Sequence, residues 1–495
     1  MRFTISRAKA ARLMAVFAVV ALVAASCSSD DGGDTATTGG DAATTTAAAG
    51  GDAATTTAAA GGGTEVIKLA VLSECSGAFG AFHQQDMAGV GAAMAEYAGA
   101  TITDPNDATA GWTGASVNGV PIELVGIGCG DDTADTAIEE TRRLMEQLGA
   151  DIMIGPLSGD ESIAVANYAK DHPTQTFING SAGAMDTTLE VQAPNFFRYN
   201  SDGAQWNAGT GDVAFNDLGW KTAAVIMDDY SFAWTSGAGF IAEFCAAGGE
   251  VTSRVFPPLN TTDYSSFVSQ LPGPDEVDGY FWVVGGSGTL PALKAFEDAV
   301  GPVTPDQHMG NLFWEFAAGS MDPSMEGAYI GGFGTAGDLK LDSVAAHTAI
   351  IASHYDNLEP FGDAAAQANS GFLVNYFAAS QALIEGLEKV GADISDGQVA
   401  LQGALGGLQL AGPYGTTTLD GNRQAVQDQY VRQFVLLDDG TLGLSTVAVI
   451  PAVDQTFGGT FEQGNMPSRD VPGCEPSDLS WLGNATPVVD GVPQG

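Results

Sequence analysis

The stretch Ile152–Ser162, with the sequence IMIGPLSGDES, decides the fold of this chain. A short apolar run that ends at Gly-Pro predicts a buried strand, and the Ser, Asp and Glu residues after it predict the start of a helix over 163–170. The pattern recurs where the short strand Thr176–Ile178 precedes the small polar loop Asn179–Gly183. In a parallel sheet both loops lie at the carboxyl ends of strands, where free backbone N–H groups can face a ligand. We therefore predict that the two loops form the floor of a binding cleft.

Strand-like and helix-like runs alternate through the chain from Glu65 onward. The alternation continues past Tyr199 into a second set of about the same size. The longest amphipathic helix is expected over Gly371–Val390, and the stretch 431–451 is mainly strand-like. Such alternation predicts parallel sheets covered by helices on both faces. We expect an α/β fold with two Rossmann-like lobes, followed by a Gly/Pro-rich C-terminal coil over 458–495.

The composition limits the classes of partner. The chain has 495 residues, of which 45% are apolar, so it can bury the cores of two or three domains. Its 17 Lys and Arg residues against 60 Asp and Glu residues give a net charge of −43. Nucleic acids and anionic lipid surfaces both need clustered basic residues. We therefore expect neither as a partner, and interpret the acidity as a solvated surface.

The N-terminus predicts export. Basic residues precede an apolar run over 13–25 that is too short for a membrane-spanning helix but suits a secretory signal. The sequence Leu22–Cys27 resembles a bacterial lipobox, which implies that residues 1–27 are a lipoprotein signal and that Cys27 is lipidated; ordinary signal cleavage nearby is the alternative. Residues 28–63 contain the unit GGDAATTTAAA twice, at Gly39–Ala49 and Gly50–Ala60, and are expected to form a disordered linker. We predict an extracytoplasmic protein held at the cell membrane through its lipid anchor alone.

Four cysteines remain after Cys27, and an even number in an exported chain indicates two disulfides. Cys75 and Cys129 each follow a predicted strand, and neighbouring parallel strands would place both at the same end of one sheet. We therefore prefer the pair Cys75–Cys129. The pair Cys245–Cys474 follows by elimination, and free buried thiols are the alternative.

Motifs for catalysis are missing from the sequence. None of the five His residues lies in a His-Glu-x-x-His pattern, and no Gly-x-Ser-x-Gly surrounds Ser158, Ser181 or Ser287. The run Gly126–Asp131 lacks the spacing of a dinucleotide-binding loop. The nearby aspartates at 131, 132 and 135 favour a helix cap over a calcium loop. We expect no enzyme activity, no cofactor and no metal site.

Several landmarks together resemble a known family. They are, in order along the chain, Ile67–Leu72 with Ser76-Gly77, the turn Ile154–Pro156, the pair Ser181-Ala182, the pair Phe197-Arg198, and Gly412-Pro413 with Leu419–Asn422. Their order and spacing resemble a type I periplasmic binding protein of the branched-chain amino acid branch, the extracytoplasmic receptors of ABC importers.

The resemblance implies two lobes joined by three crossings, with a ligand held between them by lobe closure. Transferred to this chain, lobe 1 is 65–198 plus 335–426, and lobe 2 is 199–334 plus 427–457. It also implies a monomer whose ligand-bound form is recognised by a membrane permease and its ATPase.

The same resemblance implies the ligand contacts. The expected positions are Phe82, Ser158, Gly159, Asp160, Ser181, Ala182, Gly183, Tyr230, Phe232, Ser287, Leu312 and Trp314.

Several of these positions depart from the family pattern. Gly159 and Gly183 stand where amino-acid binders have side-chain hydroxyls, and Ser287 stands in place of a Tyr. Leu312 stands where an acidic residue pairs with the ligand ammonium, although Glu315, Asp160 and Asp229 are near in sequence to the expected contacts. An ordinary branched-chain amino acid is therefore not the expected ligand.

Aromatic residues are frequent among and beside the expected contacts, including Phe79 and Trp234. They indicate a partly apolar or ring-bearing ligand, with a core role in the cleft wall as the alternative for each. We predict a non-enzymatic solute receptor of an ABC importer for a small amino-acid-like, amide or aromatic solute. The alternatives are a sensory module of the same fold and, less favoured, an exported hydrolase.

Overall fold

The computed structural model describes residues 64–334 and 336–494. The signal sequence, the lipidation residue Cys27 and the linker over 28–63 lie outside these residues. Among the described residues no helix is long and apolar enough to cross a bilayer.

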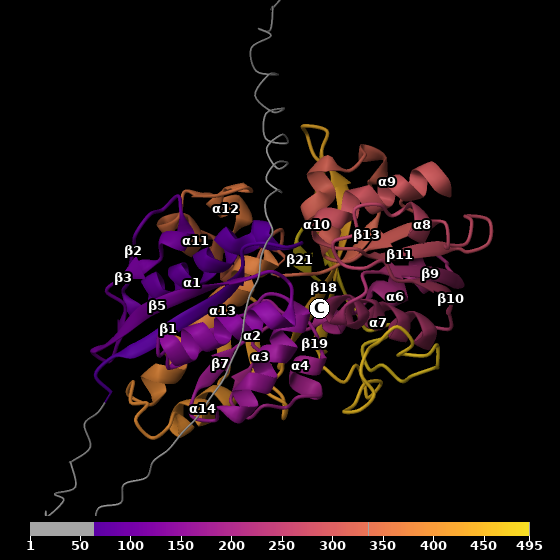
Figure 1. Cartoon of the computed structure of the whole chain (residues 1–495). Helices are drawn as coiled ribbons and strands as arrows, with labels where there is room; N and C mark the ends of the chain where they lie inside the picture. The colour runs from indigo at the N-terminus through magenta and orange to yellow at the C-terminus, as the bar shows by residue number, and fades with distance from the viewer. Residues whose placement is uncertain (1–63, 335, 495) are drawn as a thin grey trace, which may run out of the picture. The chain divides into compact units, whose positions relative to one another are not determined.

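The first sheet has six strands in the order β4-β5-β1-β6-β7-β8, of which β1, β5 and β7 are labelled in Figure 1. Strand β1 (Ile67–Glu74) lies in the middle and pairs in parallel with β5 (Val120–Gly130) and β6 (Ile152–Ile154). The remaining strands are β4 (Ser116–Val117), β7 (Thr176–Ile178) and β8 (Phe196–Phe197). Only the short hairpin of β4 with β5 is antiparallel in this sheet.

Helices cover both faces of the first sheet because side chains alternate along its strands. Ile67, Leu69 and Val71 of β1 belong to the core shared with α1 and α13, whereas Ala70 and Leu72 face α2 and α3. The bounds of the helices in this lobe are α1 His83–Ala98, α2 Ala134–Arg142, α3 Gly159–Asp171, α4 Asp186–Leu189, α11 Asp342–His354, α12 Ala364–Gln367, α13 Gly371–Lys389 and α14 Val399–Gly406. Small strands lie outside the main sheet at β2 Thr101–Ile102, β3 Trp112–Thr113, β14 Asn357–Leu358 and β15 Gly362–Asp363.

The second sheet has eleven strands and combines a parallel half with an antiparallel half. The parallel half runs in the order β10-β9-β11-β12-β13, with bounds β9 Thr222–Met227, β10 Glu250–Val255, β11 Gly279–Val283, β12 His308–Gly310 and β13 Tyr329–Gly331. The antiparallel half consists of β16 Leu410–Gly412, β17 Gly415–Leu419, β18 Ala425–Leu436, β19 Leu442–Val453, β20 Thr486–Val489 and β21 Val492–Pro493. Its helices are α5 Gly203–Trp206, α6 Thr210–Asp212, α7 Ser231–Ala246, α8 Ser265–Val268, α9 Thr289–Ala299 and α10 Phe313–Ala317.

The two-lobed α/β fold expected from the sequence is confirmed. The long helix predicted over Gly371–Val390 is present as α13 and is almost wholly buried. The expectation of purely parallel sheets holds for the central strands of each lobe, but the long hairpin of β18 and β19 adds an antiparallel half to the second sheet.

The predicted C-terminal coil over 458–495 is wrong in part. Strands β20 and β21 lie in this stretch, and β20 pairs with β19 at the edge of the second sheet. The few apolar residues of β20 lie among Gly and Pro residues, so the alternation that marks a strand is too short to recognise. The segment is also tied to α7, because Cys474 forms a disulfide with Cys245.

The structure contains both disulfides considered from the sequence. Cys75 comes directly after the last residue of β1, whereas Cys129 lies within the parallel strand β5, opposite Ser73. The Cα atoms of the two cysteines lie 5.3 Å apart. Cys245 and Cys474 have a Cα–Cα distance of 5.2 Å, although 229 residues separate them in the sequence.

The chain passes between the sheets three times, after β8, after β13 and before β18. The first and last crossings run side by side, with Arg198 paired to Gln424 in a parallel bridge. The fully buried Arg198 donates to the Ala184 carbonyl oxygen (2.6 Å), the Thr188 hydroxyl (2.8 Å) and the Gln424 amide oxygen, and it lies 3.7 Å from the Asp202 carboxylate. Burial lowers the pKa of Arg198 to about 10, and burial raises the pKa of Asp202 to about 6. The first crossing therefore depends on the buried guanidinium of Arg198 and on the hydrogen-bond acceptors and carboxylate that surround it.

Replacing Arg198 with Met should lower the free energy of unfolding by about 3–5 kcal/mol, because it leaves Asp202 as a buried charge without a positive partner. The measurement is urea denaturation of the mature chain. Arg142→Met is the matched control, since Arg142 is exposed on α2 and should change stability by no more than about 0.5 kcal/mol. Equal stability of the two variants would contradict the role given to Arg198.

Candidate ligand-binding site

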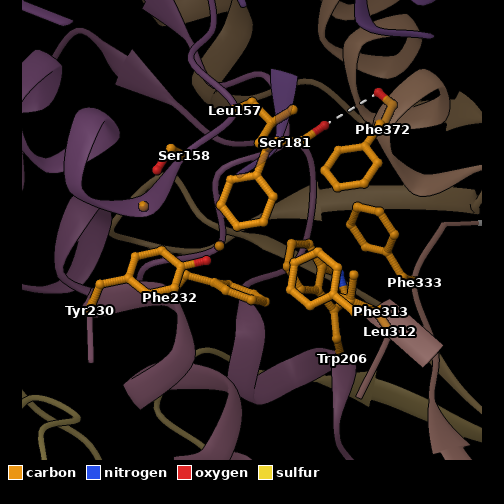
Figure 2. Close-up of a pocket in the computed structure, with 13 residues that line it drawn as sticks. Leu157, Ser158, Ser181, Trp206, Tyr230, Phe232, Leu312, Phe313, Phe333 and Phe372 are labelled. Carbon is orange, nitrogen blue, oxygen red and sulfur yellow. Dashed lines mark hydrogen bonds between the residues drawn. The ribbon is translucent and has the colours of Figure 1, made fainter. Parts of the chain in front are cut away.

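A cavity lies between the two lobes at the carboxyl ends of the central strands (Figure 2). It holds about 280 Å³ of space not filled by protein atoms, but the centre of a water-sized sphere can move through only about 20 Å³ of it. The cavity is therefore a narrow slot. Its lining residues are Phe79, Leu157, Ser158, Gly159, Ser181, Gly183, Trp206, Tyr230, Phe232, Leu312, Phe313, Phe333 and Phe372.

The first polar edge of the slot is the N-terminus of α3. Ser158 precedes the helix in an extended conformation and makes no side-chain cap bond, and its hydroxyl is buried without a hydrogen-bond partner among the described residues. The backbone N–H groups of Gly159 and Asp160 also have no acceptor among the described residues. Free N–H groups at the positive end of a helix dipole bind anions such as carboxylates. This edge can therefore hold a ligand carboxylate.

The second polar loop is more fully used by the protein itself. The Ser181 hydroxyl donates to the carbonyl oxygen of Phe372 at 3.3 Å, as the dashed line in Figure 2 shows. The carbonyl oxygen of Ala182 accepts from the Asn179 side chain (3.0 Å) and, weakly, from Arg198 (3.4 Å). Ala182 therefore shapes the loop but does not line the slot.

Seven aromatic rings form most of the remaining wall. Phe79 stacks on Phe313 with centroids 5.4 Å apart, and Phe232 meets Phe313 edge-on at 5.8 Å. Trp206 packs edge-on against Phe333 at 4.8 Å, as does Phe372 against Phe333 at 4.8 Å. A slot between rings favours a flat apolar group, because it buries both faces of such a group at once.

The surroundings of Gly159 and Gly183 explain why these positions lack the side-chain hydroxyls that the resemblance implies. A Cβ atom at Gly183 would lie 2.4 Å from the Trp206 ring and 2.9 Å from Phe232. A Cβ atom at Gly159 would lie 2.7 Å from the Ser231 hydroxyl oxygen and 3.0 Å from Phe232. The absence of a side chain at both glycines therefore allows residues of lobe 2, including Trp206 and Phe232, to approach the loops of lobe 1.

The lobes touch directly beside the slot. Ser231 of α7 donates its backbone N–H to the Asp160 carboxylate at 3.3 Å, and Met185 donates its N–H to the Thr235 hydroxyl at 3.2 Å. Asp160 therefore serves as a contact between lobes rather than as a lining residue.

Of the twelve expected contacts, seven line the slot: Ser158, Gly159, Ser181, Gly183, Tyr230, Phe232 and Leu312. Phe82 and Ser287 line a neighbouring cavity instead. Trp314 points into the core of lobe 2, where it lies over Gly310 and stacks near Phe434. Trp314 was expected as one of the aromatic residues near the cleft, and its neighbour Phe313 lines the slot instead.

Five lining residues were not anticipated from the sequence: Leu157, Trp206, Phe313, Phe333 and Phe372. Phe372 was part of the amphipathic pattern of α13, but nothing in that pattern separates a core position from a lining one. Trp206 and Phe333 lie at the crossings between lobes, so only the arrangement of the lobes brings them to the slot.

No lining residue of the slot is charged among the described residues. Leu312 occupies the place of the expected acidic partner and is buried. The acidic residues that could have compensated have other partners: Glu315 pairs with Arg432 at 2.9 Å, and Asp229 pairs with Arg469. The slot therefore has no acidic side chain in its lining to pair with a ligand ammonium.

A group of buried carboxyls lies behind the floor of the slot. Glu74 accepts the backbone N–H of Ser158 at 3.3 Å, and Glu161 accepts the N–H groups of Asp131 and Asp132, each at 3.1 Å. Asp132 in turn accepts the N–H of Ala78 at 2.5 Å and so fixes the loop that carries Phe79. No cluster among the described residues has the arrangement of a metal site. These carboxyls therefore serve to position the binding loops.

Burial without basic partners favours the protonated forms of these carboxyls. Burial raises the pKa of Asp132 to about 8, with the neighbouring Glu74 adding to the effect. Burial likewise raises the pKa of Glu161 to about 7, and that of Glu74 well above its usual range.

Comparison with known proteins agrees with this geometry. The sequence profile of the periplasmic binding protein family matches residues 66–441. The chain is a type I periplasmic binding protein. The search of curated proteins found no match.

Solved structures of periplasmic binding proteins share the fold. A solute-binding protein of an ABC transporter from R. palustris, in complex with benzoate, is 22% identical with a TM-score of 0.63, over 78% of this chain and 97% of that one. A second from R. palustris, in complex with 4-hydroxybenzoate, is 18% identical with a TM-score of 0.64, over 79% and 98%. A leucine-binding protein from Thermotoga maritima is 17% identical with a TM-score of 0.58, over 78% and 99%. At these identities the likeness shows the fold alone.

Membership of the family confirms the coarse functional expectation. Periplasmic binding proteins of ABC importers are solute receptors that lie outside the cytoplasm and pass a small molecule to a permease and ATPase. The identity of the solute is not decided by the family.

Gly183→Ala should lower the free energy of unfolding by about 1–3 kcal/mol, because the added methyl group overlaps the Trp206 ring. Gly403→Ala is the matched control: Gly403 lies in α14 with no neighbour within 4 Å of the added atom, and the change should be neutral or slightly stabilising. Urea denaturation of both variants measures the difference. A neutral result for Gly183→Ala would mean that Trp206 does not need the space.

The buried carboxyls predict a pH dependence of stability. Glu161 and Asp132 have raised pKa values in the folded protein, so their stabilising contribution is complete below the ordinary carboxyl pKa of about 4. It falls as pH rises and is lost once the pH passes about 7 for Glu161 and about 8 for Asp132. Each group contributes a slope of up to about 1.4 kcal/mol per pH unit. Glu161→Gln keeps the acceptor oxygen and removes the ionisation, so its free energy of unfolding should fall less between about pH 5 and 7 than that of the wild type.

Other buried carboxyls such as Asp228 and Glu243 have raised pKa values too, so the test is the difference in slope between variants. Glu297→Gln on the exposed side of α9 is the control and should retain the wild-type slope. Identical slopes for Glu161→Gln and the wild type would show that Glu161 does not titrate in this range.

Proposed function

We propose that this protein is the extracytoplasmic solute receptor of an ABC importer and that its ligand is a small aromatic carboxylate. The observation that carries the proposal is the uncharged aromatic slot with the free N-terminus of α3 at its edge. Because the slot as it stands admits little more than a water molecule, the wall rings part when the ligand enters and bury its aromatic group, and the free N–H groups with the Ser158 hydroxyl bind the carboxylate.

The same slot disfavours an α-amino acid. Placing an ammonium group beside Leu312 would remove it from water without the carboxylate that the resemblance places there to pair with it. Two proteins of similar structure are in complex with benzoate and with 4-hydroxybenzoate, which supports an aromatic acid as the ligand class. A leucine-binding protein also has a similar structure, but the lining residues of this chain fit an amino acid less well.

The mechanism follows from the two lobes. A ligand that touches α3 of lobe 1 and the rings of lobe 2 stabilises the form in which the lobes are in contact, and that form is presented to the permease. The role is one of binding, with no catalytic step. Lipidation at Cys27, the linker over 28–63, the lobe boundaries at residues 198, 335 and 427, and a monomeric state are parts of the same proposal. A sensory module would share the binding step and differ in its partner.

Benzoate should raise the melting temperature of the mature chain, because it binds the folded state only; a concentration about 100 times the Kd adds about 2.7 kcal/mol. Leucine at the same concentration should produce no shift. Ser158→Ala should weaken benzoate binding about tenfold or more, since it removes a hydrogen bond to a charged group.

Calorimetric titration measures both affinities. The matched control is Ser353→Ala, an exposed serine on α11, which should leave the affinity unchanged. A stronger shift with leucine than with benzoate, or full affinity in Ser158→Ala, would contradict the proposal.

A further inference from the structure

A second cavity adjoins the aromatic slot. It holds about 500 Å³ of unfilled space, and about 200 Å³ admits the centre of a water-sized sphere, so it is much wider than the slot. Its walls include Phe82 of lobe 1 together with Ser287, Leu290 and Phe316 of lobe 2. We call it the outer chamber. Two of the expected ligand contacts, Phe82 and Ser287, lie here rather than in the slot.

Phe313 is the wall that the slot and the outer chamber share. On the slot side its ring stacks on Phe79 at 5.4 Å with an angle of 9° between the planes, and it meets Phe232 edge-on. Its place depends on Gly285, because a Cβ atom there would lie 2.3 Å from the ring. The ring is held between lobe 1 and lobe 2 and is 5% exposed.

Phe313 also lies far from the carboxylate edge of the slot. Figure 2 shows Ser158 and Phe313 on opposite sides of the cavity. A ligand whose carboxylate meets the N-terminus of α3 therefore has its distal end directed toward the Phe313 side of the cavity. The space continues beyond that ring, in the outer chamber.

We propose that Phe313 sets the length of the ligand, by separating a slot for one aromatic ring from an outer chamber with room for a second. The inference rests on the proposed function and deepens it to a residue that determines specificity. Removing the ring joins the two cavities, so the protein should then accept a two-ring aromatic carboxylate that the wild type excludes. The outer chamber is apolar on the sides of Phe82, Leu290 and Phe316, which suits a second ring.

The experiment measures the Kd values of benzoate and biphenyl-4-carboxylate for the mature wild type and for Phe313→Ala. The wild type should prefer benzoate. Phe313→Ala should bind benzoate up to about tenfold more weakly, because one aromatic contact is lost, and biphenyl-4-carboxylate at least about tenfold more tightly than the wild type does.

Two further variants keep the test decisive. Phe313→Val retains more of the buried volume and should show the same change of preference if Phe313→Ala does not fold. Leu290→Ala widens the outer chamber but leaves Phe313 in place, and should keep the wild-type preference.

The outcomes separate the two proposals. If the wild type binds benzoate and the ratio of the two Kd values is unchanged in the Phe313 variants, Phe313 does not divide the site, and the proposed function stands. If Leu290→Ala changes the ratio as much as the Phe313 variants do, the separating role is likewise refuted. If no form of the protein binds either acid, both proposals fail.

Discussion

The buried guanidinium of Arg198 is the interaction on which the arrangement of this protein depends. It lies at the first crossing between lobes, beside the last crossing at Gln424, and it donates to the carbonyl oxygens of the loop that follows β7. One side chain therefore connects the hinge to the floor of the binding slot. A buried cation requires its partners to be in place, because an unpaired charge in a protein interior costs several kcal/mol. Arg198 consequently couples the position of the loop Asn179–Gly183 to the path of the chain between the lobes.

The binding slot contrasts with this charged hinge and with the surface of the molecule. A chain with a net charge of −43 lines its cavity with aromatic rings and hydroxyls, and no described lining residue carries a charge. The carboxyls nearest the floor, Glu74, Glu161 and Asp132, accept backbone N–H groups and hold the loops from behind. Burial raises their pKa values, that of Glu161 to about 7 and that of Asp132 to about 8, which favours their neutral forms below neutral pH and weakens their repulsion of a carboxylate held at the N-terminus of α3. The combination favours an acid with an apolar body.

Much of the fold could be anticipated from local patterns. The strand and loop of Ile152–Ser162, the second loop at Asn179–Gly183 and the long helix α13 all follow from apolar periodicity and from turn residues. The glycines at 159 and 183 indicated a departure from amino-acid binding, but the reason for them appears only in the structure, where Trp206 and Phe232 occupy the space. The expected contact Trp314 does not line the slot, because α10 turns it toward Phe434 and places its neighbour Phe313 there.

By itself the sequence determined the α/β class, the two lobes and the two loops that form the floor, because strands, helix starts and turns depend on residues close together in the chain. The tertiary structure alone decided which rings form the slot, where Phe313 divides it from the outer chamber, and how the C-terminal strands complete the second sheet. These features join residues that are far apart in the sequence, and their positions depend on packing between lobes. The stretch Ile152–Ser162 thus marks the site, and lobe 2 determines what the site can hold.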